Sequence, residues 1–560
     1  MKRINPRYPL YTGIVICLAL LCSCGSKKQS PSQLVSTPEE LNAKSAEIIA
    51  SYCSEWSSVA GEEPDTVLNL RQPRMVSGLY EQLNYGLVWS GGEKWKPGAD
   101  SLITLIGKAR LYGLFPSDYH HNELEGIRAQ MLADSLSQNA RKNPELWSRA
   151  DLWLTDAFIQ VTRDVKLGRI PNDSISLNKD SVIRDSFYLQ QLRSLPVSGT
   201  ITSLLQALEP RHWGYQRLKQ GIMRFLEKAD FRTYAKVPSP AKKDPGFKRA
   251  LQHRLYEGGY LQSDSLVADS VQLAGAIKKF QQDKDIATDG IAGEATVRML
   301  NLSDHDKFIR IAISMDKYKK FPAEMPSKYI WVNASSNYLQ VISEDSIRFS
   351  SRVITGKART RTPLLNGAVS VLITYPQWVP PPSIVTKEIL PALKKNPGYL
   401  ARKGFSLLDR EGNEVDPFTV DWSKYSKGVP YRIVQGSGDA NALGVLKFHF
   451  DNKYSVYLHD TNQRYLFNQA ARSLSHGCVR VQEWEKLALF LLGPQNRMAD
   501  TLQTWLKNKE KHHLGLKNKV PVFIRYFTCE GKDGQIQFYD DVYGDDQYLA
   551  EKYFARKDDR

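Results

Sequence analysis

Ser475-His476-Gly477-Cys478-Val479-Arg480 is the stretch that decides how this 560-residue chain folds and acts, and His459-Asp460-Thr461 lies shortly before it. A cysteine is a strong nucleophile only as the thiolate, so a nearby imidazole has to accept its proton. Gly477 has no Cβ, which lets a substrate carbonyl approach the surrounding backbone N–H groups. The stretch therefore predicts a nucleophile, a base and an oxyanion hole.

Cys478 also has a simpler interpretation, as a buried structural thiol beside incidental histidines, because free cysteines are often buried. However, the run from Ser475 to Arg480, with His459 before it, closely resembles the signature of the L,D-transpeptidase (YkuD-type) catalytic domain. The resemblance favours a catalytic cysteine.

The resemblance extends along the C-terminal part of the chain. Segments similar to the strands of that domain follow one another at 329–333, 338–341, 353–357, 441–444, 447–448 and 456–461. Between them, residues 375–438 resemble the inserted capping subdomain of the large YcbB-like branch of the family, and Trp378-Val379-Pro380-Pro381 lies near the start of this insertion.

The resemblance implies a role for each residue of the motif. Cys478 is the nucleophile, and His459 is the general base that later donates the proton. The backbone carbonyl of Asp460 orients the imidazole, so the carboxylate of Asp460 is not required for this role. His476 and Gly477 line the oxyanion hole together with Cys478.

Three further residues are expected to contact substrate. Arg480 is a candidate for binding a carboxylate of a peptide stem, since a guanidinium matches that group; an ion pair inside the domain is the open alternative. Tyr457 and Trp378 are the other two. No metal and no organic cofactor is expected.

The reaction implied by the resemblance is the formation of a 3→3 peptidoglycan cross-link. Cys478 attacks a tetrapeptide donor stem, D-Ala leaves, and an amine of a second stem resolves the thioester. Three alternatives stay open: a non-catalytic lipoprotein that tethers the membrane to peptidoglycan, an L,D-carboxypeptidase, and a transferase that attaches a protein to the wall.

Length and pattern predict a multi-domain α+β protein. We expect a helical N-terminal scaffold at 38–245, a catalytic domain at 326–528 that is mainly β, and a C-terminal tail at 529–560. Residues 246–302 resemble a small three-helix peptidoglycan-binding module, with Gly258-Gly259 and Asp289-Gly290 as turn signals. Other cell-wall enzymes are further candidate partners.

The N-terminus resembles a lipoprotein export signal. Basic residues precede an apolar run, and Leu21-Cys22-Ser23-Cys24 resembles a bacterial lipobox. We therefore expect a signal peptide at 1–23, lipidation of Cys24, a flexible tether at 24–37, and a protein that faces the periplasm from the outer membrane. An ordinary signal peptide or a short anchor helix is the alternative.

Net charge, the remaining cysteines and the remaining histidines are weaker evidence about function than the motif around Cys478. The net charge of +16 would fall to +13 without Lys2, Arg3 and Arg7, but it is diffuse and no nucleic-acid motif is present, so cell wall and anionic lipid are the expected counterparts. Whether Cys53 and Cys529 pair stays open. The doublets His120-His121 and His512-His513 are expected to be solvated surface.

Overall fold

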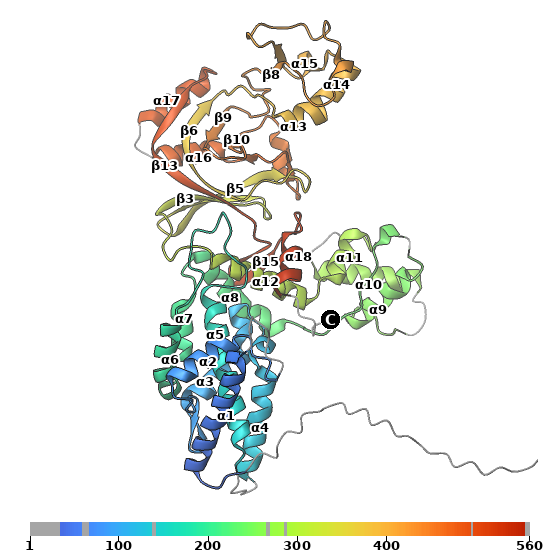
Figure 1. Ribbon diagram of the computed structural model, residues 1–560. Coiled ribbons are helices and arrows are strands. Elements are labelled where there is room, and N and C mark those ends of the chain that lie inside the picture. The colour runs from blue at the N-terminus through green and yellow to red at the C-terminus, as the bar shows by residue number, and fades with distance from the viewer. Residues whose placement is uncertain are drawn as a thin grey trace, which may run out of the picture.

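The structure, a computed structural model, describes residues 34–58, 67–136, 142–242, 244–264, 269–284, 288–493 and 497–554. The expected signal peptide, Cys24 and most of the expected tether lie outside these residues. Figure 1 shows an elongated molecule, with a helical part at one end, a large sheet above it and a small lobe at the far end. In the described ranges, no helix has the length and apolar character of a membrane span.

The helical scaffold surrounds α5, which is buried over most of its surface. Its helices are α1 (Pro38–Ser58), α2 (Pro73–Gln82), α3 (Pro97–Gly107), α4 (His121–Leu136), α5 (Pro144–Lys166), α6 (Asp185–Ser198), α7 (Ile201–Leu208) and α8 (Trp213–Lys228). Two short strands, β1 (Ser90–Gly91) and β2 (Lys94–Trp95), form a hairpin among them. The N-cap Asn143 accepts a hydrogen bond from the Glu145 N–H, and Pro144 at the first helical position fits the start of α5.

The scaffold differs from expectation at His120. His120 is buried and its Nε2 lies 2.8 Å from a carboxylate oxygen of Asp156, so the expectation of a solvated histidine was wrong. The same carboxylate accepts the N–H groups of Arg71 and Gln72, which shows that the buried charge is shared among several donors.

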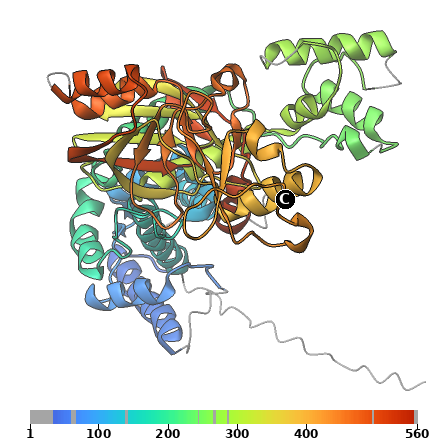
Figure 2. The ribbon, with the colours of Figure 1, turned by 90° about the horizontal axis from the view of Figure 1, so that it is seen from above.

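The peptidoglycan-binding module contains α9 (Phe247–Glu257), α10 (Ser270–Asp283) and α11 (Glu294–Asn301) around a small core of its own. Figure 2 shows this module projecting to one side of the molecule, away from the sheet. The helix that follows, α12 (Asp304–Tyr318), returns to the scaffold and begins with a capping box between Ser303 and Asp306.

The catalytic domain is built on a nine-stranded sheet whose order is β11-β5-β12-β10-β9-β6-β13-β3-β4. Its strands are β3 (Lys328–Asn333), β4 (Tyr338–Ser343), β5 (Ser346–Gly356), β6 (Leu365–Thr374), β9 (Leu446–His449), β10 (Leu458–His459), β11 (Ser473–Ser475), β12 (Val479–Val481) and β13 (His513–Arg525). Because β4 also pairs with β5, the sheet closes on itself as a barrel. The helices α16 (Trp484–Leu492) and α17 (Arg497–Lys507) add apolar side chains to its core.

Strand β3 joins the barrel to the scaffold because both of its faces are buried. Ile330 and Val332 point into the barrel core, whereas Tyr329 and Trp331 belong to the cluster that contains residues of α8 and α12. Catalytic domain and scaffold therefore share one continuous apolar contact.

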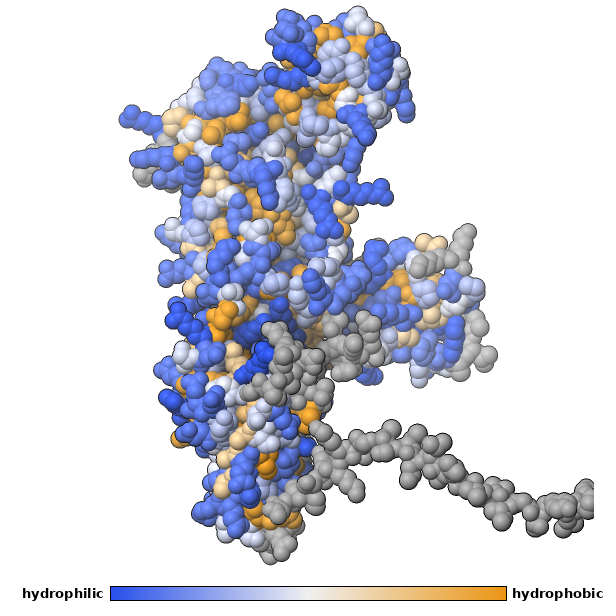
Figure 3. Space-filling model, in the orientation of Figure 1, coloured by the Kyte–Doolittle hydropathy of each residue, from blue (hydrophilic) through white to orange (hydrophobic). Residues whose placement is uncertain are grey.

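Residues 375–438, the expected capping subdomain, form the far lobe in Figure 1. The elements there are α13 (Pro382–Ile384), η4 (Val385–Ile389), α14 (Leu390–Lys395), α15 (Tyr399–Arg402), β7 (Phe405–Leu408), η5 (Trp422–Lys424) and β8 (Arg432–Gln435), with a separate core. Figure 3 shows apolar surface on this lobe, and its exposed large apolar side chains include Val379 and Phe418.

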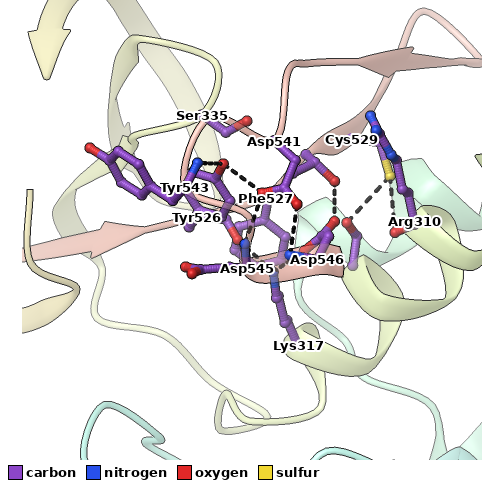
Figure 4. A network of polar contacts seen from close by, with 12 residues as sticks. Arg310, Lys317, Ser335, Tyr526, Phe527, Cys529, Asp541, Tyr543, Asp545 and Asp546 are labelled. Atoms are coloured by element: carbon purple, nitrogen blue, oxygen red, sulfur yellow. Dashed lines mark hydrogen bonds and ion pairs between the residues drawn. The ribbon is translucent and has the colours of Figure 1, made fainter. Parts of the chain in front are cut away.

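The segment at 529–560, expected to be a tail, is folded as far as the structure describes it. It forms β14 (Cys529–Lys532), β15 (Gln535–Phe538), α18 (Asp545–Leu549) and η7 (Ala550–Phe554). Cys529 is buried against α12, with its sulfur 3.3 Å from the Ser314 hydroxyl, whereas Cys53 lies in the scaffold core, so the two are not joined. This segment ties the end of the barrel to α12 (Figure 4).

Candidate active site

The register of three neighbouring strands gathers charged side chains on one face of the sheet. His459 on β10 is opposite Arg480 on β12 and opposite Lys447 on β9. Residues paired across neighbouring strands point to the same face, so these three side chains form a row. Leu458 and Val479 point the other way and are fully buried in the barrel core.

Cys478 and Tyr457 lie two residues before Arg480 and His459, directly before the first residues of β12 and β10. The Val479 N–H donates to the Tyr457 carbonyl at 3.1 Å, which fixes the two strand ends side by side. Tyr457, through its backbone and its side chain, acts to lower the pKa of Cys478, and the Trp378 side chain acts to lower the pKa of Tyr457, so each pair lies within interaction range. The structure thus brings Cys478, Tyr457 and Trp378 together.

A backbone carbonyl group orients the imidazole of His459. Its Nδ1 lies 2.5 Å from the Asp460 carbonyl oxygen. A carbonyl oxygen only accepts, so Nδ1 carries the proton and Nε2 is left as the basic nitrogen. Burial, followed by the positive charge of Arg480, lowers the pKa of His459 to about 3, so the ring is neutral at physiological pH.

The Cys478 thiol is partly exposed and forms no disulfide. Crowding by protein atoms raises the pKa of Cys478, while hydrogen bonds from Tyr457 and the charges of Lys447 and Arg480 act in the opposite direction. Because burial is the largest effect, thiol and imidazole are both neutral at rest. A thiolate has to form by proton transfer during the reaction, rather than being present beforehand.

The Asp460 carboxylate is buried and braces the loop before β9. One oxygen accepts the Val445 N–H at 3.0 Å, and the two oxygens pair with the Arg464 guanidinium at 2.7 and 3.1 Å. The carboxylate therefore has structural partners of its own, while the carbonyl contacts the imidazole.

Ser475 and Gly477 shape the turn before the nucleophile. Gly477 has a φ of +124°, a conformation that favours glycine, and its N–H donates to the Ser475 hydroxyl at 3.1 Å. That hydroxyl in turn donates to the Cys478 carbonyl at 2.7 Å. The expected Gly477 donor is thus occupied in this structure, whereas no acceptor in the described part of the chain takes the Cys478 N–H.

His476 turns toward the capping subdomain. Its Nε2 lies 2.5 Å from a carboxylate oxygen of Glu388, which belongs to η4. The ring was expected to line the oxyanion hole, but the contact it makes is one that connects the cap to the residue two before the nucleophile.

Arg480 favours the ligand-binding interpretation over the internal ion pair. Its Nη1 donates to the Gln463 side chain at 3.0 Å, and within the described ranges no carboxylate lies within 4 Å of it. A half-buried guanidinium with only a neutral partner is suited to an acidic ligand.

Sequence reasoning missed two residues of this site. Lys447 places its Nζ 3.9 Å above the Tyr457 ring and is close enough to Cys478 for their charges to interact. The sequence identified Lys447-Phe448 as part of a strand. It did not show that Lys447 lies opposite His459, because that depends on how β9 and β10 are paired. Glu388 had no local signal, because its contact depends on how the cap folds.

Comparisons with known proteins define the class of this chain. Residues 327–507 match the family model described as the L,D-transpeptidase catalytic domain, residues 74–222 match "Scaffold domain", and residues 248–300 match "Putative peptidoglycan binding domain". The chain thus contains a YkuD-type L,D-transpeptidase catalytic domain and a peptidoglycan-binding domain on a helical scaffold.

Particular proteins match over part of the chain. A protein of Haemophilus influenzae named "Putative L,D-transpeptidase" is 36% identical over 220 residues, which is 39% of this chain and 45% of that relative, so the match spans less than half of the relative's length. A crystal structure of an L,D-transpeptidase from Xylanimonas cellulosilytica covers 53% of this chain and all of that chain at 13% identity and a TM-score of 0.15, which is too low to support an argument.

Proposed function

We propose that this protein is an L,D-transpeptidase that forms 3→3 peptidoglycan cross-links. Cys478 attacks the carbonyl of the third residue of a tetrapeptide stem. The amide bond to D-Ala breaks, D-Ala takes up a proton as it leaves, and a thioester remains. An amine of a second stem then attacks the thioester, which restores the thiol and leaves a new amide bond.

One observation carries the proposal: in a domain of this class, the register of β10 and β12 places Cys478 two residues before Arg480, the partner of a neutral His459, and Lys447 and Arg480 are close enough to act on the thiol. The Nε2 of His459 is suited to take the thiol proton, to return it to the departing D-Ala amine and to deprotonate the second amine. The Cys478 N–H is the donor suited to the oxyanion. Lys447 and Arg480 are suited to the carboxylates of the stems.

The capping subdomain is proposed to exclude water from the thioester, so that the amine reacts in preference to water. Its contacts with the site, Glu388 to His476 and Trp378 to Tyr457, support this role. A tethering protein without catalysis would need neither this cap nor a positioned thiol.

Location is the second part of the proposal. We infer that Cys24 is lipidated, that the protein faces the periplasm from the outer membrane, and that the peptidoglycan-binding module attaches it to the wall. Labelling with an alkyne-modified palmitate tests this: label should appear on the full chain and not on a Cys24→Ala variant. Label on both, or on neither, would contradict the assignment.

The catalytic proposal is tested with peptidoglycan rich in tetrapeptide stems, incubated with the chain lacking residues 1–24 or with its Cys478→Ala variant, and analysed by mass spectrometry of muropeptides. New 3→3 dimers that depend on Cys478 are expected. Tripeptide monomers without dimers would indicate a carboxypeptidase, and an unchanged pattern would favour a tethering role.

A further inference from the structure

A cavity of about 220 Å³ lies where scaffold, α12, barrel and C-terminal segment meet. Its wall takes residues from the loop after α5, from the end of α12, from the end of β13 and from α18, and includes none of the active-site residues above. Figure 4 shows four of the lining residues, Lys317, Tyr526, Phe527 and Asp545, around the C-terminal segment. This cavity is separate from the candidate active site.

The charges on the wall do not balance. Lys317 pairs with Asp546 at 2.7 Å, and Asp545 pairs with Arg361 at 2.7 Å. That leaves Arg525 and Lys320 as cations and Asp173 as an anion among the lining residues. In the described ranges, no carboxylate lies within 4 Å of Arg525 or Lys320, so one positive charge is unmatched.

Arg525 is a strongly buried cation, with 3% of its surface exposed. Its guanidinium donates only to neutral oxygens, the carbonyls of Leu365, Ile524 and Ile175 and the side-chain oxygen of Asn366. Burial lowers the pKa of Arg525 to about 9, with Asp173 as the opposing influence. A buried charge without a counter-ion is costly, so an anion in the cavity would be stabilised.

Lys320 has N–H groups that can donate hydrogen bonds to a ligand in the cavity. Its ammonium has three donors, and the Leu167 carbonyl at 2.9 Å is the acceptor that the described residues provide. No carboxylate pairs with Lys320 at close range in the described residues: Oδ1 of Asp173 accepts the N–H groups of Ile175 and Ser176 and the Ser176 hydroxyl, and Asp316, which acts on Lys320 more strongly than Asp173, pairs with Lys319. An anionic ligand can therefore bond to Lys320 directly and face Arg525.

The rest of the wall is mostly apolar, apart from the hydroxyl groups of Ser176, Tyr526 and Tyr548, and fits a small ring or short chain. Phe321, Leu364, Phe527 and Leu549 contribute to it. An apolar cavity of about 150 Å³ is large enough to hold benzene, so this one holds a slightly larger molecule. We propose that the cavity binds a small organic monoanion, an aromatic or short aliphatic carboxylate whose charge lies at Lys320 and Arg525.

Benzoate and its neutral isostere benzamide test the proposal by isothermal titration calorimetry on the chain lacking residues 1–24. Benzoate is expected to bind saturably and at least about tenfold more tightly than benzamide, because charged hydrogen bonds exceed neutral ones. Equal affinity for the two, or no saturable binding of benzoate, would overturn it.

Four variants locate the binding. Lys320→Met should weaken benzoate about tenfold, whereas Lys424→Met, an exposed lysine of the cap, should change nothing. Leu364→Trp fills the cavity and should abolish binding, which covers the case that Lys320→Met fails to fold. Lys447→Met should leave benzoate affinity unchanged; loss of binding in that variant would place the benzoate in the active site instead and overturn the assignment.

Discussion

Lys447 and Arg480 bring positive charge to the Cys478 thiol, but burial dominates its pKa. The same cations and the same burial keep the His459 ring neutral. In the proposed mechanism, proton transfer from sulfur to Nε2 therefore accompanies the attack on the bound substrate, because neither thiolate nor imidazolium is present beforehand. Without substrate, the Cys478 thiol and the His459 imidazole are therefore both expected to be neutral.

The resting thiol predicts a pH profile for alkylation. A raised pKa leaves little thiolate at pH 7, so the rate of iodoacetamide alkylation of Cys478 should rise about tenfold per pH unit from pH 7 to 9. The chain lacking residues 1–24 is used, which removes Cys17, Cys22 and Cys24, and Cys478→Ala is the control, because Cys53 and Cys529 are buried. Fast alkylation that is constant from pH 6 to 8 would instead indicate a preformed thiolate and imidazolium.

Substitutions of His459 and of Asp460 should have different effects on turnover. His459→Ala removes the base and should lower turnover about 10³-fold. Asp460→Asn keeps the carbonyl that holds the ring and should retain turnover within about tenfold, but it weakens the pair with Arg464 and should lower the melting temperature. Similar losses of turnover in both variants would mean that the carboxylate, and not the carbonyl, acts on His459.

Among the elements, η4 of the cap and the turn before β12 are coupled by a single polar contact. Glu388 belongs to the cap, which has a hydrophobic core of its own, and it contacts His476 in the turn before the nucleophile. The contact therefore depends on the position of the cap relative to Cys478. We therefore expect the position of the cap to affect the turn that carries Cys478.

Glu388→Gln should reduce the formation of dimers about tenfold and increase the share of hydrolysed tripeptide, since the charged hydrogen bond is lost. Glu411→Gln, an exposed glutamate of the same subdomain, serves as the control and should behave as wild type. His476→Ala should have the same effect, and the double variant no more than either single one. Additive losses would show that the two residues act separately.

The elements also show what sequence could and could not predict. The multi-domain α+β fold class was confirmed, because the motif around Cys478 and the module around Asp289-Gly290 are local patterns. The site roles stay predictions. Lys447 was missed since its place beside His459 depends on strand register, and His120 was misjudged because its partner, Asp156, lies on another helix.

At the scale of the whole molecule, the C-terminal segment adds a second connection between scaffold and barrel, beside the one made by β3. Strands β14 and β15 pack on α8, and Gly531 approaches the α8 backbone so closely that an added Cβ would lie 2.2 Å from the Arg217 carbonyl group. Sequence gave no signal for this contact, because it unites residues more than three hundred positions apart.

Gly531→Ala should therefore destabilise the protein by about 3 kcal/mol, since a backbone on each side leaves the new methyl no room. Gly515→Ala on β13 meets nothing within 4 Å and should be nearly neutral. Chemical denaturation of both variants measures the difference. Equal stability would contradict the close packing of the C-terminal segment on the scaffold.

The most direct test of the central claim is the intact mass of the enzyme during turnover of a tetrapeptide stem without an amine acceptor. A mass increase equal to the tripeptide acyl group, located on Cys478 by peptide mapping and absent from Cys478→Ala, is predicted, together with release of D-Ala. Release of D-Ala by both proteins, or an acyl group on another residue, would contradict the assignment of Cys478 as the nucleophile.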